Sequence, residues 1–231
     1  MLPSSGSGES SMYMIIVGAG SIGTSLIEIA VNEKNNVVVV ESNPERARYI
    51  QDRYDITVLS GDATSAETLR EAGSERADAL IVTTSDDAVN LMVVSIAVEL
   101  GIPAIVSVVN KKEHADFFRK LGANVMENPE EVVAHHLYNA VKRPNVQDFA
   151  LLPEGAQIFR LKVAEGSPLV DRSISESRQR ELIPDSMQIL AVSRDGKQTI
   201  PEGETVIQEG DILTVFSLEQ VSDKLIEKLT G

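Results

Sequence analysis

The chain has 231 residues, of which 42% are hydrophobic and 24% are charged, enough for one large or two modest folded domains. It contains no cysteine, which excludes disulfides and thiolate chemistry, and no stretch approaches the ~20 apolar residues of a membrane-spanning helix. The formal net charge of −14 disfavours nucleic acid as a partner, and it means that a phosphate-bearing ligand needs locally fixed donors. We expect a folded protein of the reducing cytoplasm.

The first part of the chain alternates apolar runs with helical segments. Residues 1–11 are small and polar and predict a disordered leader. The apolar runs that follow span residues 13–17, 37–40, 56–59, 79–82 and 104–109. A sixth short strand at 124–126 and a helix from Pro129 to about Val141 complete the pattern. The repeated units predict an α/β domain over residues 12–141, with a Rossmann-like doubly wound parallel sheet.

The second part of the chain has a different pattern of apolar and polar residues. Residues 142–155 carry two prolines and little periodicity, which predicts a linker. Beyond it, alternating strands are expected within residues 158–163, 187–200 and 211–216, with a hairpin turn at Asp195-Gly196. Helical pieces are expected at residues 177–183 and 219–229. Residues 156–231 are therefore predicted to form a small α+β domain.

A glycine-rich motif stands between the first strand and the first helix, with the sequence GAGSIG from Gly18 to Gly23. Gly18 permits a tight turn, Gly20 lets the backbone approach a diphosphate, and Gly23 lets the helix pack closely on the strand. Backbone amides at the start of the helix would then meet the phosphates. This context predicts a dinucleotide or adenine-nucleotide site.

Glu41, at the end of the second strand, indicates which nucleotide is favoured. A carboxylate at this position can accept hydrogen bonds from both ribose hydroxyls, whereas a 2′-phosphate about 5 Å away would be repelled by roughly 6 kcal/mol at an effective dielectric of about 20. We therefore predict NAD(H), ATP or ADP in preference to NADP(H). Arg46, one turn into the next helix, is interpreted as a solvated helix residue.

Two further strand ends are expected to face the same crevice. Asp62 and Ala63 follow the third strand, and Thr83 and Thr84 follow the fourth. For Asp62, helix capping and acceptance from an adenine amino group are equally supported. Asp86 and the residue after it are interpreted as helix caps.

The ordered motifs resemble those of the TrkA-type regulators of potassium transport, which carry RCK (KTN) domains. The first domain matches in the glycines, Glu41, GDAT, TTSDDAVN and NKKEHADFFRKLGANVMENPEEV. The second matches the RCK-C (TrkA-C) pattern in EGSPLVDRSISE, ILAVSRDGK and P-x-x-x-x-V-I-Q-x-GDIL. The similarity extends from Met12 to Gly231.

The resemblance implies a gating subunit that catalyses no reaction and binds NAD(H) or adenine nucleotides. It also implies homodimers that assemble into a tetramer or larger ring, and docking on a membrane potassium transporter or channel subunit at the inner face of the cell membrane. The family's nucleotide contacts carry over to Gly18, Ala19, Gly20, Ser21, Ile22, Glu41, Asp62, Ala63, Thr83 and Thr84.

Two positions depart from the family pattern. Ser21 and Val108 stand where family members can carry arginine. Both departures remove a cation that would face a phosphate, which favours NAD(H) over strong discrimination between ATP and ADP.

The alternative is an NAD-dependent oxidoreductase of two-domain or short-chain type. Tyr138 and Lys142 have the Tyr-x-x-x-Lys spacing of a proton-transfer pair, but the helix that carries them follows the sixth strand. No metal site is expected, because the histidines are few and two of them are adjacent on a helix: His114, His135 and His136. At least one of Phe117, Phe118 and Leu121 is expected at an interface between subunits.

Overall fold

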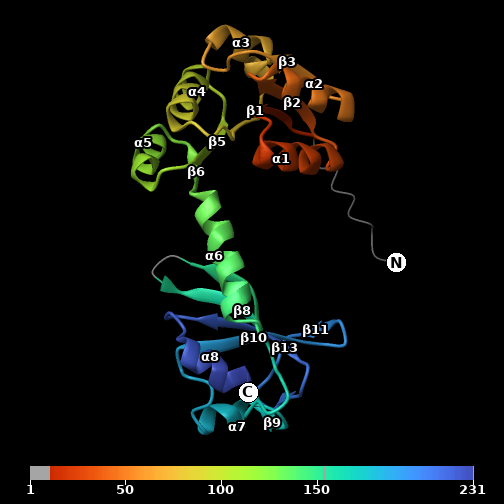
Figure 1. Cartoon of the computed structure of the whole chain (residues 1–231), viewed down its shortest axis with the longest axis vertical. Helices are drawn as coiled ribbons and strands as arrows, with labels where there is room; N and C mark the ends of the chain where they lie inside the picture. The colour runs from red at the N-terminus through yellow and green to blue at the C-terminus, as the bar shows by residue number, and fades with distance from the viewer. Residues whose placement is uncertain (1–10, 153–154, 231) are drawn as a thin grey trace, which may run out of the picture. The chain divides into compact units, whose positions relative to one another are not determined.

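The computed structural model describes residues 11–152 and 155–230, with only the backbone of His135 and Leu151. The predicted leader therefore lies outside the described residues except for Ser11. The chain divides into two compact units, Met1–Glu130 and Glu131–Gly231, which are described separately (Figure 1). Within the described ranges, no helix combines the length and apolar character that crossing a membrane requires.

Unit 1 contains a six-stranded parallel sheet in the order β3-β2-β1-β4-β5-β6. The strands are β1 (Tyr13–Val17), β2 (Asn36–Glu41), β3 (Thr57–Ser60), β4 (Ala79–Val82), β5 (Ala104–Val109) and β6 (Asn124–Glu127). The predicted Rossmann-like sheet is thus confirmed. The strand order reverses between β1 and β4, where open α/β sheets bind ligands.

Helices cover both faces of this sheet. They are α1 (Ser21–Asn32), α2 (Pro44–Arg53), α3 (Ala66–Glu71), α4 (Asp87–Glu99) and α5 (Ala115–Lys120), with short 3₁₀ turns η1 (Ser74–Arg76) and η2 (Lys112–His114). Two of the starts are capped by side chains. Asn43 accepts from two amides at the start of α2, and Asp86 does the same at α4, as predicted for Asp86.

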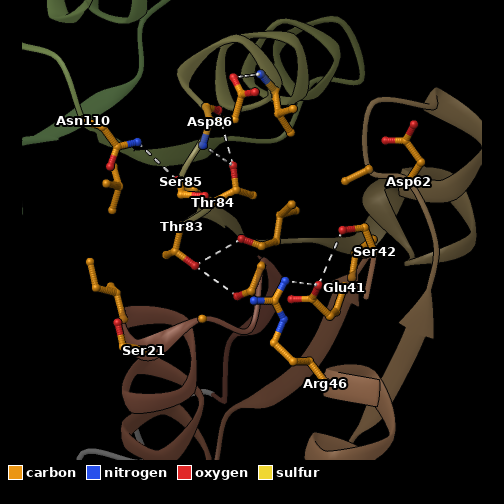
Figure 2. A pocket seen from close by; sticks show the side chains of 18 of the residues that line it. Ser21, Glu41, Ser42, Arg46, Asp62, Thr83, Thr84, Ser85, Asp86 and Asn110 are labelled. Atoms are coloured by element: carbon orange, nitrogen blue, oxygen red, sulfur yellow. Dashed lines mark hydrogen bonds and ion pairs between the residues drawn. The ribbon is translucent and has the colours of Figure 1, made fainter. Parts of the chain in front are cut away.

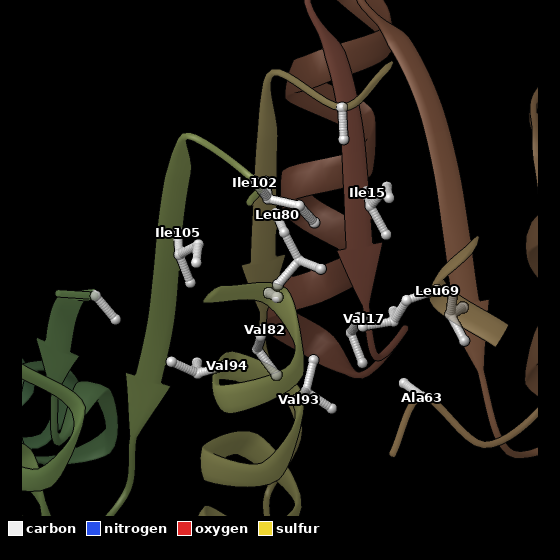
Figure 3. Packing of buried hydrophobic residues seen from close by; sticks show 14 of the residues in the cluster. Ile15, Val17, Ala63, Leu69, Leu80, Val82, Val93, Val94, Ile102 and Ile105 are labelled. Atoms are coloured by element: carbon white, nitrogen blue, oxygen red, sulfur yellow. The ribbon is translucent and has the colours of Figure 1, made fainter. Parts of the chain in front are cut away.

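The core follows from the two-faced burial of the strands. Ile15 and Val17 of β1 point to one face, where they pack with residues such as Val93 of α4 (Figure 3). Ile16 points to the other face and packs with Ile27 of α1. Because consecutive strand side chains alternate between faces, a strand that is apolar throughout must be buried on both sides.

Unit 2 holds a five-stranded sheet in the order β11-β10-β13-β8-β7 and a two-stranded sheet, β12-β9, with antiparallel pairing throughout. The strands are β7 (Val146–Leu151), β8 (Gln157–Lys162), β9 (Arg172–Ser173), β10 (Met187–Arg194), β11 (Lys197–Thr199), β12 (Val206–Ile207) and β13 (Ile212–Ser217). The helices are α6 (Pro129–Lys142), which begins at the end of unit 1, α7 (Ile174–Gln179) and α8 (Asp223–Thr230). The predicted α+β domain is confirmed.

Two local predictions in unit 2 are wrong. The segment 142–155, predicted as a linker, contains β7, which pairs with β8. Its alternation is hidden because the register shifts between Gln147 and Ala150, and Asp148 has a φ of 48°. The helix expected at 177–183 is α7, which starts earlier because Ser173 caps it by accepting from the amide of Glu176 at 3.1 Å.

The hairpin turn between β10 and β11 is as predicted. Asp195 and Gly196 both have positive φ, 51° and 75°, which a two-residue hairpin loop of type I′ requires. Beneath the sheet, Phe159, Leu213 and Val215 pack with residues of α8 such as Ile226.

Candidate functional site

A cavity of about 580 Å³ lies over the carboxyl ends of the strands of unit 1 (Figure 2). Its wall draws on residues that follow β1 to β5 and on the first residues of α6. Glu41, Arg46 and Asp62 lie toward one end, and Asp86 and Asn110 lie toward the other (Figure 2). The cavity therefore spans the point where the strand order reverses, which is where dinucleotides bind in folds of this class.

Two of the three glycines in the turn after β1 are required by the fold of the chain, and the third is not. Gly18 has a φ of 92°, and a Cβ on Gly23 would lie 2.0 Å from the carbonyl oxygen of Gly18, so the chain itself requires both glycines. A Cβ on Gly20, by contrast, would meet no described atom within 4 Å. Gly20 is also the N-cap of α1, so no capping side chain occupies the amides of the first turn. The turn leaves room for an anion at the start of α1.

Glu41 is held from several sides. Its side chain is 3% exposed, and Oε2 accepts a hydrogen bond of 2.7 Å from the backbone N–H of Ala19. Oε1 accepts from the N–H of Asn43 at 2.8 Å and pairs with the guanidinium of Arg46 at 3.2 Å. A carboxylate oxygen can accept two hydrogen bonds, so Oε2 keeps one position for a ribose hydroxyl.

Asp62 and Ala63 form the wall after β3. Oδ1 of Asp62 accepts from the backbone N–H of Thr64 at 2.9 Å and from its hydroxyl at 2.7 Å, and these hydrogen bonds lower the pKa of Asp62. The N-cap of α3 is Ser65, so Asp62 orders the preceding loop and does not cap the helix. The buried Ala63 lies beside it on the cavity wall.

The threonines after β4 use their hydroxyls within the protein. Thr83 Oγ1 donates to the carbonyls of Val17 and Gly18, which ties β4 to the glycine turn. Thr84 Oγ1 donates to Oδ1 of the buried Asn90 at 2.5 Å. The two hydroxyls therefore fix the shape of the wall.

Asn110 follows β5 and is positioned by a buried carboxylate. Asp87 accepts from the backbone and side-chain N–H groups of Asn110, both at 2.8 Å, from the N–H of Lys111 at 3.0 Å, and pairs with His114 Nδ1 at 2.8 Å. Burial raises the pKa of Asp87, but these hydrogen bonds outweigh burial and lower it. Asp87 therefore anchors the loop after β5, and its interpretation as a helix cap is wrong.

Nine of the eleven predicted site residues line the cavity: Gly18, Gly20, Ser21, Ile22, Glu41, Asp62, Ala63, Thr83 and Thr84. Ala19 and Gly23 are not on the wall. Ala19 is buried and its N–H is hydrogen-bonded to Glu41, and Gly23 packs against Gly18 of the turn. Among the residues of the wall that were not predicted are Ser42, Arg46, Ser85, Asp86, Asn110, Pro129 and Glu130. Most of these residues follow the end of a strand. The same signal, a position directly after a strand end, could have identified Asn110 from the sequence.

Arg46 differs from its sequence interpretation. It is half exposed, but it pairs with Glu41 and lines the cavity, so it is part of the site and not only a solvated helix residue. Ser21 and Val108, where family members can carry arginine, both line the cavity as well. Within the described residues, Arg46 is thus the one cationic side chain on the wall.

The Tyr138–Lys142 pair does not form a proton-transfer site. Lys142 Nζ lies 5.8 Å from the centre of the Tyr138 ring and pairs with Asp223 Oδ2 at 2.5 Å. The hydrogen bond with Asp223 raises the pKa of Lys142, so this ammonium is already engaged by a carboxylate of the same unit. Neither Tyr138 nor Lys142 lines the cavity. Among the described side chains, no group of three histidines and acids could hold a metal, and the side chain of His135 lies outside that set.

Comparison with known proteins agrees with this geometry. The TrkA-N domain family matches residues 14–129, and the TrkA-C domain family matches residues 158–230. The chain belongs to the TrkA family. TrkA-type RCK domains are regulatory and not enzymatic, which decides against the oxidoreductase alternative.

Two relatives illustrate the extent of the match. A Trk system potassium uptake protein TrkA homolog of Pyrococcus abyssi is 30% identical over 227 residues, covering 94% of this chain and 98% of that protein. The Trk system potassium uptake protein TrkA of Vibrio alginolyticus is also 30% identical, over 208 residues, and the match covers 87% of this chain but 45% of that longer protein.

Solved structures share the fold. The GsuK channel bound to NAD covers the whole of this chain with a TM-score of 0.62 at 24% identity, and the match takes up 40% of the GsuK chain. GsuK bound to ADP covers 58% of this chain and 36% of its own, with a TM-score of 0.51 at 22% identity. At these identities the likeness establishes the fold alone.

Proposed function

We propose that this chain is the nucleotide-sensing subunit of a potassium transport system. It binds NAD(H), or alternatively ATP or ADP, in the cavity over β1 and thereby controls a membrane potassium-translocating protein from the cytoplasmic face. Relatives named for potassium uptake, and a channel of the same fold seen with NAD and with ADP, support the proposal.

The observation that carries the proposal is the open space at Gly20. The chain has no internal need for glycine there, yet the position begins α1, whose first amides no side chain caps, and it follows Ala19, whose N–H holds Glu41 beside the turn. A diphosphate over Gly20 would meet the positive end of the α1 dipole, and the adenosine ribose would then reach Glu41. These local donors would bind the phosphates even though the chain as a whole is acidic.

The extent of the cavity favours a dinucleotide over a mononucleotide. An adenosine at Glu41 occupies the part of the cavity beside Arg46 and Asp62, whereas the wall continues past β4 to Asn110 and Glu130. A second nucleoside, as in NAD(H), fills that continuation. The carboxylate of Glu41 disfavours the 2′-phosphate of NADP(H).

Self-assembly is the second part of the proposal. On α6, Val133, Leu137 and Val141 recur every four residues and are 58%, 62% and 85% exposed. Such a stripe on a helix is costly in water and is typical of a surface that a second subunit covers. We propose a homodimer that assembles further into a tetramer or larger ring, in which Phe117, exposed on α5, supplies a further contact.

Control by the nucleotide would be a population shift. A tenfold difference in affinity between two ring shapes supplies about 1.4 kcal/mol for each site, so several coupled sites are needed to switch the assembly. A ring provides those sites.

The proposal is tested by a pair of glycine variants in calorimetric titrations with NADH and ADP. Gly20→Ala is expected to fold normally, because its Cβ enters open space, and to lose about tenfold or more in affinity, because that Cβ stands where the diphosphate would lie. Gly23→Ala is expected to destabilise the fold itself. Glu28→Ala, on the exposed side of α1 and away from the cavity, serves as the control for a substitution in that helix. If Gly20→Ala binds the nucleotides with unchanged affinity, the diphosphate does not lie over this turn.

A further inference from the structure

The two ends of the cavity differ in the hydrogen bonds that they offer. At the glycine turn, beside the Glu41 end, the amides of the first turn of α1 are donors. At the Asn110 end, both N–H groups of the Asn110 amide are already used, because Nδ2 donates to Asp87 Oδ1 at 2.8 Å and to the carbonyl of Thr84 at 3.3 Å. Both partners are acceptors, so Nδ2 must face them, and Oδ1 of Asn110 remains as an acceptor.

The same end is negatively charged. Asp86 and Glu130 both line the wall there and are exposed to solvent. The whole described wall carries four carboxylates, Glu41, Asp62, Asp86 and Glu130, against the single guanidinium of Arg46. Since Arg46 pairs with Glu41, its charge is used at the other end of the cavity. We call Asp86, Asn110 and Glu130 the acceptor end.

We propose that the acceptor end makes the site selective for oxidised NAD⁺ over NADH. This inference rests on the proposed function, because it requires a dinucleotide whose adenosine lies at Glu41. The nicotinamide riboside then lies at the acceptor end, where its ribose hydroxyls and carboxamide N–H groups are donors. Its ring carries one positive charge in NAD⁺ and none in NADH, so the carboxylates attract only the oxidised form.

The same argument ranks the mononucleotides. Extending ADP by a third phosphate adds negative charge toward Asp86 and Glu130 without adding a cation, since the one cationic side chain on the described wall, Arg46, pairs with Glu41. ATP is therefore expected to bind more weakly than ADP.

The test compares dissociation constants of the full chain for NAD⁺ and NADH by calorimetry at one fixed salt concentration. NAD⁺ is expected to bind about threefold to tenfold tighter, the effect of one unit charge several ångströms from carboxylates at a dielectric between those of a protein surface and water. Raising the salt concentration is expected to reduce the ratio, because the charges are exposed.

Two charge-neutralising variants identify the residues. Glu130→Gln and Asp86→Asn are each expected to lower the preference for NAD⁺ by about twofold to threefold, and asparagine at position 86 keeps the N-cap of α4. Glu99→Gln, which makes the same chemical change at the exposed end of α4 away from the cavity, is the matched control and is expected to leave the preference unchanged.

The outcomes separate this inference from the proposed function. Equal binding of NAD⁺ and NADH, tighter binding of NADH, or a preference that both variants leave intact would overturn the inference while nucleotide binding stands. Binding of ADP without either dinucleotide would do the same. If no nucleotide binds, the proposed function fails and the inference fails with it.

Discussion

The backbone N–H of Ala19 donates to Oε2 of Glu41 at 2.7 Å, across 22 residues of sequence. The bond joins the glycine turn after β1 to the end of β2, and Glu41 also accepts from the N–H of Asn43. The carboxylate that is predicted to bind the ribose therefore also shapes the cavity before any ligand arrives.

Removal of this carboxylate is expected to cost stability as well as affinity. Glu41→Ala leaves the N–H groups of Ala19 and Asn43 without their acceptor, so we expect the free energy of unfolding to fall by about 2–4 kcal/mol. Urea denaturation without nucleotide measures the effect, and Glu28→Ala on the exposed side of α1 is the control. An unchanged unfolding curve together with weaker nucleotide binding would mean that Glu41 acts on the ligand alone.

Arg46 is expected to set how strongly NADP(H) is rejected. Its guanidinium offsets the charge of Glu41, so Arg46→Ala should weaken NADPH binding more than NADH binding and widen the ratio of their dissociation constants about threefold or more. Competitive titration measures the ratio. Arg48→Ala, exposed on the same helix and away from the cavity, is expected to leave it unchanged. Equal losses for both nucleotides in Arg46→Ala would contradict a role in this discrimination.

The exposed stripe on α6 is expected to govern self-assembly. Leu137→Glu adds a charge to a surface that would be buried in a dimer, so the dissociation constant of the dimer should rise about tenfold or more while the helical content stays the same. Sedimentation equilibrium and circular dichroism measure the two quantities. Leu137→Met, which keeps the apolar surface, should assemble like the natural chain. A Leu137→Glu chain that still dimerises normally would place the subunit contact elsewhere.

Unit 2 carries a carboxylate whose contribution to stability depends on pH. Burial of Asp211 raises its pKa, but Arg194, which donates to both of its oxygens at 2.8 Å, and the N–H of Gln208 lower it below the ordinary value of 3.8. A carboxyl with a depressed folded pKa stabilises the fold above its unfolded pKa, and this stabilisation is lost as the pH falls through the folded value.

Asp211→Asn removes that titration. The variant is expected to be less stable than the natural chain at pH 6, and the difference should shrink as the pH falls below about 3.8. Urea denaturation at several pH values measures this difference, and Asp185→Asn, at an exposed position of the same unit, controls for the loss of an exposed charge. If the difference in the free energy of unfolding is the same at pH 6 and pH 3, Asp211 contributes through packing and not through its charge.

Local pattern was sufficient for the sheet of unit 1, because strands buried on both faces are apolar throughout and contrast with the helices between them. It was insufficient for β7, where a register shift and the positive φ of Asp148 interrupt the alternation. The glycine turn and Glu41 were predictable because both belong to one continuous β1–α1–β2 segment, so their spacing along the chain is fixed. The pairing of Arg46 with Glu41 and the anchoring of Asn110 by Asp87 depend on how side chains from separate elements meet, which spacing along the chain does not encode.

Asn90 has a consequence for the energetics of binding. Its buried amide donates to the carbonyls of Thr84 and Val108 at 3.0 and 3.1 Å, and so clasps the ends of β4 and β5 together. That side of the cavity is rigid before a nucleotide enters, and few torsions there have to be frozen on association. In the proposed complex, the entropic cost of binding would therefore fall mainly on the nucleotide, whose diphosphate torsions must be fixed on association.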